Sequence, residues 1–317
     1  MLSRVKVRSY SSSANLGPGF DAIALAHTAF YDEVEININP GEGRIFFNKI
    51  TGSYASDDDV RKLVIKSIEL FKQYTGTNLD KYDINIAISK GIPLASGLGG
   101  SSALCVATIK ALTKLVDTNL RSEEIIKLAS EAERIYSGSP HYDNTAASLL
   151  GGLVVVTQDR SGNIIAEKLD LDIWLAIFIP RVYYTGLSLR LLREVIPRTV
   201  DIYVASRNSG RLALLVLAAL KRDLKLLGKM LMQDEIVEPS RARYIPCYRE
   251  IVERALEAGA LGAAISGSGP AVMALSDSRE SAERIVSQVS NKCSCCDIEV
   301  AKIARTAPGT EIVSIKR

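Results

Sequence analysis

Histidine, cysteine and tryptophan are scarce in this chain, and their scarcity limits the kinds of site it can hold. The 317 residues include two histidines, five cysteines and one tryptophan. The cysteines form an odd, unevenly spread set: Cys105, Cys247, Cys293, Cys295 and Cys296. Their cluster "CSCC" lacks the paired C-x2-C spacing of a zinc site, and few histidines are available to complete one. We therefore expect thiols in a reducing cytosol rather than metal ligands.

The chain also lacks a charge excess and a long apolar run. Its 39 basic and 36 acidic residues leave a net charge of +3, and aromatic residues make up 6% of the sequence. This balance argues against a nucleic-acid or membrane-surface binder. The apolar run "LALLVLAAL" (residues 212–220) is too short to span a bilayer, and the alternating N-terminal residues indicate a strand rather than a signal peptide. We expect a soluble, cytoplasmic protein with no nucleic-acid or membrane partner.

Glycine, by contrast, is concentrated in the stretch "GIPLASGLGGSSALCVA" (residues 91–107), directly before an apolar helical run. The stretch is not a P-loop, because no lysine follows its glycines as G-x4-G-K-S/T requires. It is not a Rossmann fingerprint either, since Ser102 stands where the last glycine belongs and no acidic residue ends a following strand. So much backbone freedom suits a loop that brings N–H groups close to a ligand.

We interpret this glycine loop as an anion site. Pro93 stiffens its entry, the glycines remove side chains, and Ser101 and Ser102 start the helix. The unpaired N–H groups of the first helical turn, together with the helix dipole, can bind a polyphosphate. The two serine hydroxyls either cap the helix or bind Mg2+ through oxygen.

A second candidate residue lies on the predicted helix 122–136. The apolar residues of this helix form one arc, and Glu133 falls inside the arc between Ile126 and Ala129. A carboxylate that faces a core needs a cation to pair with it. That cation is either a metal ion or the ammonium group of a core-facing lysine.

The remaining segments predict two lobes of mixed α/β (α+β) structure. In the first half we predict strands at 34–38, 82–89 and 151–158, and helices at 57–75, 101–116 and 122–136. In the second half we predict a strand at 172–180, helices at 187–194, 203–227, 248–258 and 279–289, a hairpin within 262–276 and a final strand at 298–303. This order suits a ferredoxin-like α/β sandwich in the second half. We place the boundary between 157 and 172, which gives domains at 1–165 and 166–317.

Three motifs in this order resemble those of the GHMP small-molecule kinases, the family of the galactose, homoserine, mevalonate and phosphomevalonate kinases. They are "SSSANLGPGFDAIALA" (11–26), "PLASGLGGSSA" (93–103) and "GAAISGSGPAVMAL" (262–275). The resemblance implies a two-lobed kinase that uses ATP and Mg2+, with a ribosomal-protein-like N-terminal lobe for the nucleotide and a ferredoxin-like C-terminal lobe. The implied nucleotide-binding residues are Lys62, Pro93, Ser96, Gly97, Leu98, Gly99, Gly100, Ser101 and Ser102. The implied metal ligands are Ser101, Ser102 and Glu133.

Further segments resemble the homoserine kinase branch of that family. They are the "SANLGPGFD" part of the first motif, "SPHYDNTAASLLGG" (139–152), "LREVIP" (192–197) and "EPSRARYIP" (238–246). This resemblance implies phosphorylation of the L-homoserine hydroxyl, a step of threonine biosynthesis. The implied substrate-binding residues are Asn15, Asp21, His141, Asp143, Asn144, Arg193 and Arg241. Of these, Asp143, Asn144 and Arg241 are also implied to be catalytic.

The charges of these residues suit a zwitterionic acceptor. Asp21 can hold an ammonium group, and Arg193 and Arg241 can clamp a carboxylate through paired N–H bonds. Asp143 either acts as a base or only orients the substrate, because the loose transition state of phosphoryl transfer needs little help from a base.

Three features depart from the usual family pattern. Gly100 stands where the first serine of G-L-G-S-S is usually found, and Lys62 stands at the position that resembles the adenine-contacting asparagine. Val237 and Ser240 replace the histidine and tyrosine often found around E-P-x-R. The open alternatives are a GHMP kinase for another alcohol, such as mevalonate or a shikimate-like acid, and a non-catalytic protein with the same fold. An anionic acceptor would have no use for Asp21, and a non-catalytic protein would have lost loop glycines or Glu133. A homodimer is the expected assembly.

Overall fold

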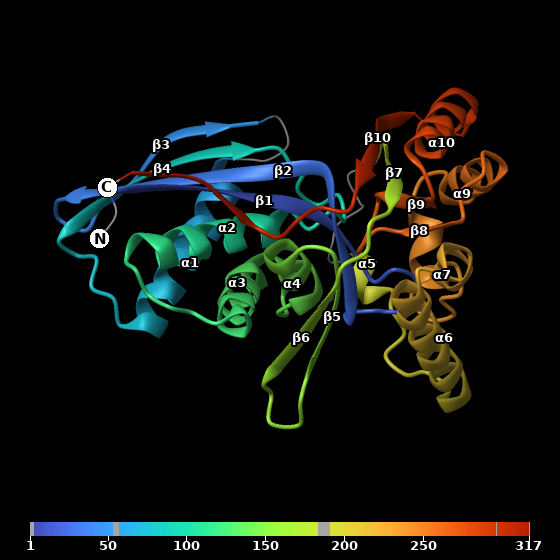
Figure 1. The fold of residues 1–317 in the computed structure, drawn as a ribbon, viewed down its shortest axis with the longest axis horizontal. Helices are drawn as coiled ribbons and strands as arrows, with labels where there is room; N and C mark the ends of the chain where they lie inside the picture. Colours follow the sequence, from blue (N-terminus) through green and yellow to red (C-terminus); the bar gives the residue numbers. More distant parts are fainter. Residues whose placement is uncertain (1–2, 53–56, 183–190, 296, 317) are drawn as a thin grey trace.

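The structure, a computed structural model, describes residues 3–52, 57–182, 191–295 and 297–316. Figure 1 shows two lobes: a long sheet with helices packed beneath it, and a smaller sheet with its own helices at the other end of the molecule. Both ends of the chain lie at the far end of the long sheet. The chain therefore leaves the first lobe and later returns to it.

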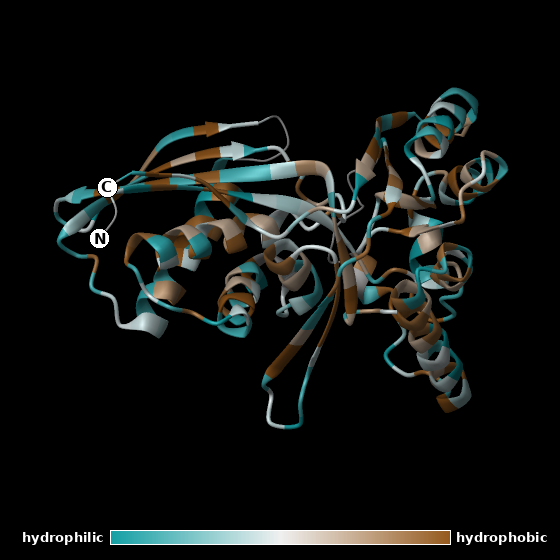
Figure 2. Ribbon diagram, viewed as in Figure 1, coloured by the Kyte–Doolittle hydropathy of each residue, from teal (hydrophilic) through white to brown (hydrophobic). Residues whose placement is uncertain are grey.

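The first lobe is built on a seven-stranded sheet. Its strands are β1 (Arg4–Ala14), β2 (Ile23–Pro40), β3 (Ile45–Thr51), β4 (Tyr82–Lys90), β5 (Leu153–Gln158), β6 (Ile164–Leu169) and β11 (Glu311–Lys316). The main path is β11-β1-β2-β4-β3, and β5 joins β2 to β6. Strands β3 and β4 pair in parallel, and the other pairs are antiparallel. Buried and more exposed residues alternate along β4 and along parts of β1 and β2, and the strands carry both hydrophobic and hydrophilic residues (Figure 2), so one face can be buried.

Four helices cover the buried face of this sheet (Figure 1). They are α1 (Asp57–Thr75), α2 (Gly100–Leu115), α3 (Ser122–Ser137) and α4 (Tyr142–Leu150). Helix α2 contacts the other three helices as well as β1 and β2, and most of its side chains are buried. The N-terminus of α2, where the glycine loop ends, is therefore held rigidly against the sheet.

The second lobe has a four-stranded antiparallel sheet in the order β10-β7-β9-β8, which is the ferredoxin-like arrangement. Its strands are β7 (Trp174–Pro180), β8 (Gly262–Ile265), β9 (Val272–Ser276) and β10 (Ile298–Arg305). Its helices are α5 (Leu191–Glu194), α6 (Ile202–Lys221), α7 (Leu224–Leu231), α8 (Glu238–Arg241), the 3-10 turn η1 (Ala242–Tyr244), α9 (Tyr248–Glu257) and α10 (Arg279–Lys292).

The two faces of the second sheet are covered differently. One face packs against α9 and α10. The other face joins a continuous core that includes Ile177 and Met273 from the second sheet, Leu227 from α7, Leu25 from β2 and Leu98 from the glycine loop. This shared core fixes the glycine loop of the first lobe relative to the second lobe.

Most predicted elements are confirmed, but the predicted helix 203–227 is wrong as a single element. Helix α6 ends at Lys221, and Arg222 adopts a left-handed conformation with φ 56°. The carboxylate of Asp223 then accepts a hydrogen bond from the Leu226 N–H, which starts α7. Of the predicted helix 187–194, residues 191–194 form α5, and the rest lies outside the described residues.

The predicted final strand, β10, is followed by another. After β10 the chain runs back along the first lobe, where the Ala307 N–H donates to the Ala26 carbonyl (2.9 Å), and β11 pairs with β1. Strand β6, which spans the predicted boundary at 165/166, pairs with β5 in the first sheet. The division into 1–165 and 166–317 stays a prediction, although residues 164–169 and 311–316 belong to the first sheet. Within the described ranges, no helix is long and apolar enough to cross a membrane.

Candidate active site

The glycine loop between β4 and α2 is held so tightly that side chains are excluded at two positions. Gly97 has φ 80°, and an added Cβ would lie 2.2 Å from the carbonyl oxygen of Ser266. Gly99 has φ 66°, and its added Cβ would lie 2.3 Å from the Ser12 hydroxyl. Gly99 is also the N-cap of α2 and offers no side-chain cap. No side-chain cap from Gly99 therefore competes for the first-turn N–H groups of α2, which are the donors of the predicted anion site.

Glu133 reaches the N-terminus of α2 from the neighbouring helix α3. It accepts hydrogen bonds from the hydroxyls of Ser101 (2.5 Å) and Ser102 (2.6 Å), so the two serines bind this carboxylate and do not cap α2. Ser101 and Glu133 line the pocket described below, whereas Ser102 is fully buried behind them. A carboxylate with adjacent hydroxyl oxygens is a donor set that fits Mg2+.

A buried ion pair that was not predicted supports the loop from beneath. The Lys90 ammonium donates to Asp32 at 2.6 Å, and the second Asp32 oxygen accepts the N–H groups of Gly91 and Ile92, both at 2.9 Å. Burial lowers the pKa of Lys90 and raises the pKa of Asp32, and their mutual attraction opposes both shifts. A Cβ at Gly100 would lie 3.1 Å from the Lys90 Nζ, so a side chain at this departure from the family pattern would pack tightly against the ammonium group.

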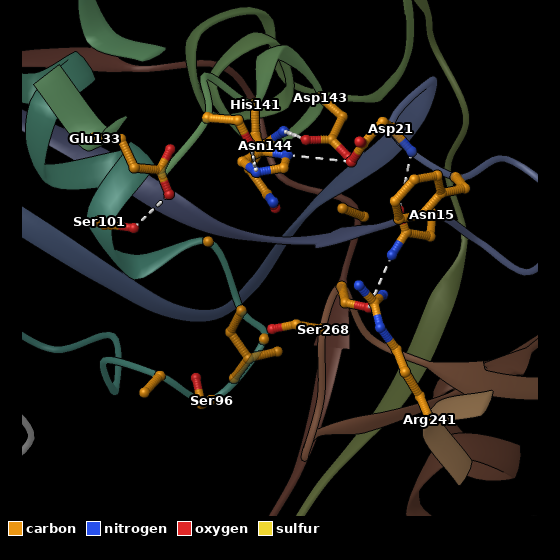
Figure 3. Close-up of a pocket in the computed structure, with 18 of the residues that line it drawn as sticks. Asn15, Asp21, Ser96, Ser101, Glu133, His141, Asp143, Asn144, Arg241 and Ser268 are labelled. Atoms are coloured by element: carbon orange, nitrogen blue, oxygen red, sulfur yellow. Dashed lines mark hydrogen bonds and ion pairs between the residues drawn. The ribbon is translucent and has the colours of Figure 1, made fainter. Parts of the chain in front are cut away.

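The opposite end of the pocket gathers titratable groups around the start of α4. The His141 Nδ1 lies 3.1 Å from an Asp21 oxygen, and one ligand atom from each of Asp21, His141 and Asp143 lies within 4.8 Å of the others. Asp143 is buried, and burial, followed by repulsion from Asp21, raises its pKa to about 7. Figure 3 shows these three side chains between Glu133 on one side and Arg241 on the other.

Asn15 and Arg241 are both hydrogen-bonded to the third motif, residues 262–275. The Asn15 amide donates to the Gly267 carbonyl at 2.8 Å and accepts the Asp21 N–H at 3.1 Å. Arg241 is buried and donates to the same Gly267 carbonyl (3.0 Å) and to the Leu192 carbonyl (2.9 Å). Asn15 therefore positions Asp21 and Arg241 relative to each other across the two lobes.

These groups line one cavity of about 380 Å3. It brings together the following predicted residues: Asn15, Asp21, Pro93, Ser96, Gly97, Leu98, Gly99, Gly100, Ser101, Glu133, His141, Asp143, Asn144 and Arg241. Asn144 connects the two ends of the cavity, because its amide oxygen accepts the Ser12 hydroxyl (2.8 Å) beside Gly99.

Two predicted residues do not line the cavity. Ser102 lies behind it, and Lys62 lies on the exposed side of α1, 2.5 Å from Asp58. The side chain of a third, Arg193, lies outside the described part of the chain. The prediction missed Arg198 and Ser268, which line the cavity. Ser268 stands inside the predicted glycine-rich hairpin, whereas Arg198 follows "LREVIP" with no spacing that singles it out.

Comparisons with known proteins agree with the motifs. The chain matches the family models of the GHMP kinases N-terminal domain at residues 62–152 and the GHMP kinases C-terminal domain at 215–295. A homoserine kinase of Aeropyrum pernix is 37% identical over 311 residues, covering 98% of this chain and 99% of the relative. A homoserine kinase of Saccharolobus solfataricus is 32% identical, covering 97% of each chain.

Solved structures give the same picture. A homoserine kinase from Cytophaga hutchinsonii is 30% identical with a TM-score of 0.85, covering 99% of this chain and 98% of that one. A mevalonate kinase of L. major, solved with R-mevalonate, is 22% identical with a TM-score of 0.74 over 96% of each chain, a likeness that shows the fold alone. The chain belongs to the GHMP kinase family, within its homoserine kinase branch.

Proposed function

We propose that this chain transfers the γ-phosphoryl group of ATP to the side-chain hydroxyl of L-homoserine and releases O-phospho-L-homoserine and ADP. One feature carries the proposal. A single cavity has an uncapped helix N-terminus at one end and groups of both charges at the other. A polyphosphate suits the first end, and a zwitterionic amino acid suits the second.

The acceptor end is matched to both charges of homoserine. The carboxylates of Asp21 and Asp143, which lie close together, attract an ammonium group. Arg241 is fixed by two carbonyls and faces the same cavity, where Arg198 adds a second positive charge. An anionic acceptor such as mevalonate would use the arginines but would be repelled by both aspartates, which favours homoserine over this alternative.

The nucleotide end would bind phosphates through the first-turn N–H groups of α2. Ser101 and Glu133 would hold Mg2+, which when bound neutralises part of the phosphate charge. Fixed glycines and the Asp32–Lys90 pair hold this end in place before any ligand enters. The peptide dipoles are therefore preorganised toward the charge that develops during transfer.

Asp143 is the group that would receive the proton of the homoserine hydroxyl. It lines the cavity, and a pKa of about 7 leaves it largely ionised above neutral pH while it can still accept a proton. Asn144, the next residue on α4, lies beside Gly99 and would orient the acceptor toward the phosphate end. His141 holds Asp21 in place through its ring nitrogen.

The test is ADP release by the purified chain with MgATP and one candidate acceptor at a time: L-homoserine, L-threonine, mevalonate or shikimate. Selective turnover of homoserine is the expected result, with phosphate found on the side-chain oxygen by 31P NMR. Turnover of mevalonate without homoserine would overturn the acceptor and keep the family chemistry. Absence of ADP release with every acceptor would overturn the proposed activity.

A further inference from the structure

A group of cysteines gathers on the second lobe, outside the cavity. Cys247 directly precedes α9, whereas Cys293 and Cys295 lie in the connection from α10 to β10. Cys247 and Cys295 are joined by a disulfide, with their Cα atoms 5.7 Å apart. The expectation that all five cysteines are thiols is therefore wrong for these two, because folding brings together residues 48 positions apart.

A third sulfur and a carboxylate complete the group. The Cys293 thiol lies 3.7 Å from Glu250, which projects from the first turn of α9. The same carboxylate accepts the backbone N–H groups of Ser294 (3.2 Å) and Cys295 (3.1 Å), so it fixes the connection that carries both cysteines. One ligand atom from each of Cys247, Glu250, Cys293 and Cys295 lies within 4.8 Å of the others.

We propose that these four residues form a binding site for one soft divalent metal ion, Zn2+ being the natural probe, when the disulfide is reduced. Thiolate sulfur and carboxylate oxygen both bind zinc, and three thiolates with one carboxylate supply the four donors of a tetrahedral site. Bonds of about 2.3 Å to zinc place tetrahedral sulfurs about 3.8 Å apart. The observed grouping within 4.8 Å therefore needs only small side-chain movements.

The site is accessible to an ion from solvent, and a nearby positive charge balances part of the charge of its ligands. Cys247, Glu250 and Cys293 are partly exposed and Cys295 is exposed, so the site is reachable. Arg254, one turn after Glu250 on α9, lies 3.7 Å from that carboxylate and offsets part of the negative charge of four anionic ligands. The ligands come from the start of α9 and from the connection that follows α10, so the ion would link the ends of two helices that pack on the same face of the sheet.

Reduction and metal binding are separate, balanced steps. A phosphine takes oxygen from water, becomes a phosphine oxide and converts the Cys247–Cys295 bond to two thiols. The divalent ion then displaces the protons of three thiols, which are released to solvent. In the oxidised state two of the three sulfurs are bonded to each other and are poor ligands, so metal binding should require prior reduction.

The test is a titration of the full chain with Co2+, after reduction by a phosphine without oxygen and removal of the excess. We expect one equivalent to bind with thiolate-to-cobalt charge-transfer absorption, and Zn2+ to displace it. Chain left oxidised should show no such band. In Cys293→Ser and Glu250→Gln we expect affinity for Zn2+ to fall at least tenfold, whereas Cys105→Ala, a change of a buried cysteine on α2, should bind as the unchanged chain does.

Retained kinase activity with homoserine, or an unchanged circular dichroism spectrum, shows that each variant is folded. If a variant does not fold, comparing Co2+ binding by the reduced and the oxidised unchanged chain still tests the metal site. Absence of a charge-transfer band in the reduced chain would overturn the proposal, and the cysteines would then form only a disulfide. A band of equal strength in the oxidised chain or in Cys293→Ser would overturn it as well.

Discussion

The two ends of the cavity differ in how the chain builds them. The phosphate end, which is the proposed nucleotide end of the cavity, comes from one continuous strand–loop–helix segment, and Glu133 is added from the next helix along the chain. The acceptor end is assembled from segments far apart in sequence, such as Asp21, Asp143 and Arg241, which come from both lobes. The course of the glycine loop thus follows from neighbouring residues, although Ser12 and Ser266 hold it in place, whereas the acceptor end forms only when the two lobes pack together.

The largest expected effect is at the phosphate end. Glu133→Gln keeps the shape of the side chain but removes the carboxylate beside Ser101. We expect kcat to fall about a thousandfold, because a bound metal ion stabilises the transition state by several kcal/mol. Steady-state ADP release at a series of Mg2+ concentrations measures this, and the apparent affinity for Mg2+ should fall with it. Glu131→Gln, a change of a partly exposed residue on the same helix, is the matched control. A normal kcat in the Glu133→Gln variant would show that Glu133 is not part of the metal site.

At the acceptor end, Asp143→Asn should lower kcat about a hundredfold, the typical contribution of general base catalysis. Because the pKa of Asp143 is about 7, kcat/KM of the unchanged chain should rise with pH up to about 7 and then level off, and the variant should lose this rise. A variant that keeps its kcat but needs more homoserine would show that Asp143 only orients the acceptor.

The same shift predicts a stability effect with a defined sign. The pKa of Asp143 is raised from 3.8 to about 7, so the folded chain holds this proton more tightly than the unfolded chain. The stabilisation is complete below pH 3.8 and is lost as the pH rises through 7. Asp143→Asn should therefore raise Tm more at pH 8 than at pH 5, in the absence of substrate.

The next effect separates two arginines of the acceptor end. Arg241 is buried and fixed by two carbonyls, whereas Arg198 is exposed. Arg241→Ala should raise KM for homoserine about 10- to 100-fold, because the substrate carboxylate loses a charge-assisted hydrogen bond. KM for ATP should change little. We expect only a few-fold rise for Arg198→Ala. Equal effects of the two changes, or a rise confined to KM for ATP, would contradict this assignment.

The smallest expected effect on activity tests the contact between the glycine loop and the second lobe. Gly97→Ala places a Cβ against the Ser266 carbonyl of the second lobe at φ 80°, so both lobes must shift. Gly76→Ala has a similar φ of 66°, but within the described residues no heavy atom lies within 4 Å of the added Cβ. Each change should cost roughly 1–2 kcal/mol for the left-handed backbone alone. Gly97→Ala should lose more stability and raise both KM values several-fold; identical melting and kinetics in the two variants would show that the contact does not matter.

Sequence patterns located the phosphate end well because its features are local. Glycine spacing and the face of one helix predicted the loop and the inward position of Glu133, and both are confirmed. The Asp32–Lys90 pair was not predicted, because nothing in either strand signals that a lysine at the end of β4 is buried against an aspartate of β2. The break of the predicted helix 203–227 was missed because the left-handed residue is Arg222 rather than glycine.

By itself the sequence determined most of the elements, the family and the place of the glycine loop before α2, since backbone freedom, helix faces and motif order are properties of neighbouring residues. Only the tertiary structure decided which serine lines the cavity, that Asn15 is a brace between Asp21 and the third motif, and that Cys247 meets Cys295. The return of β11 to β1 was decided in the same way. The physical reason is common to all of them: each depends on contacts between segments far apart in the chain, which form only when the two sheets and their helices bury their apolar faces.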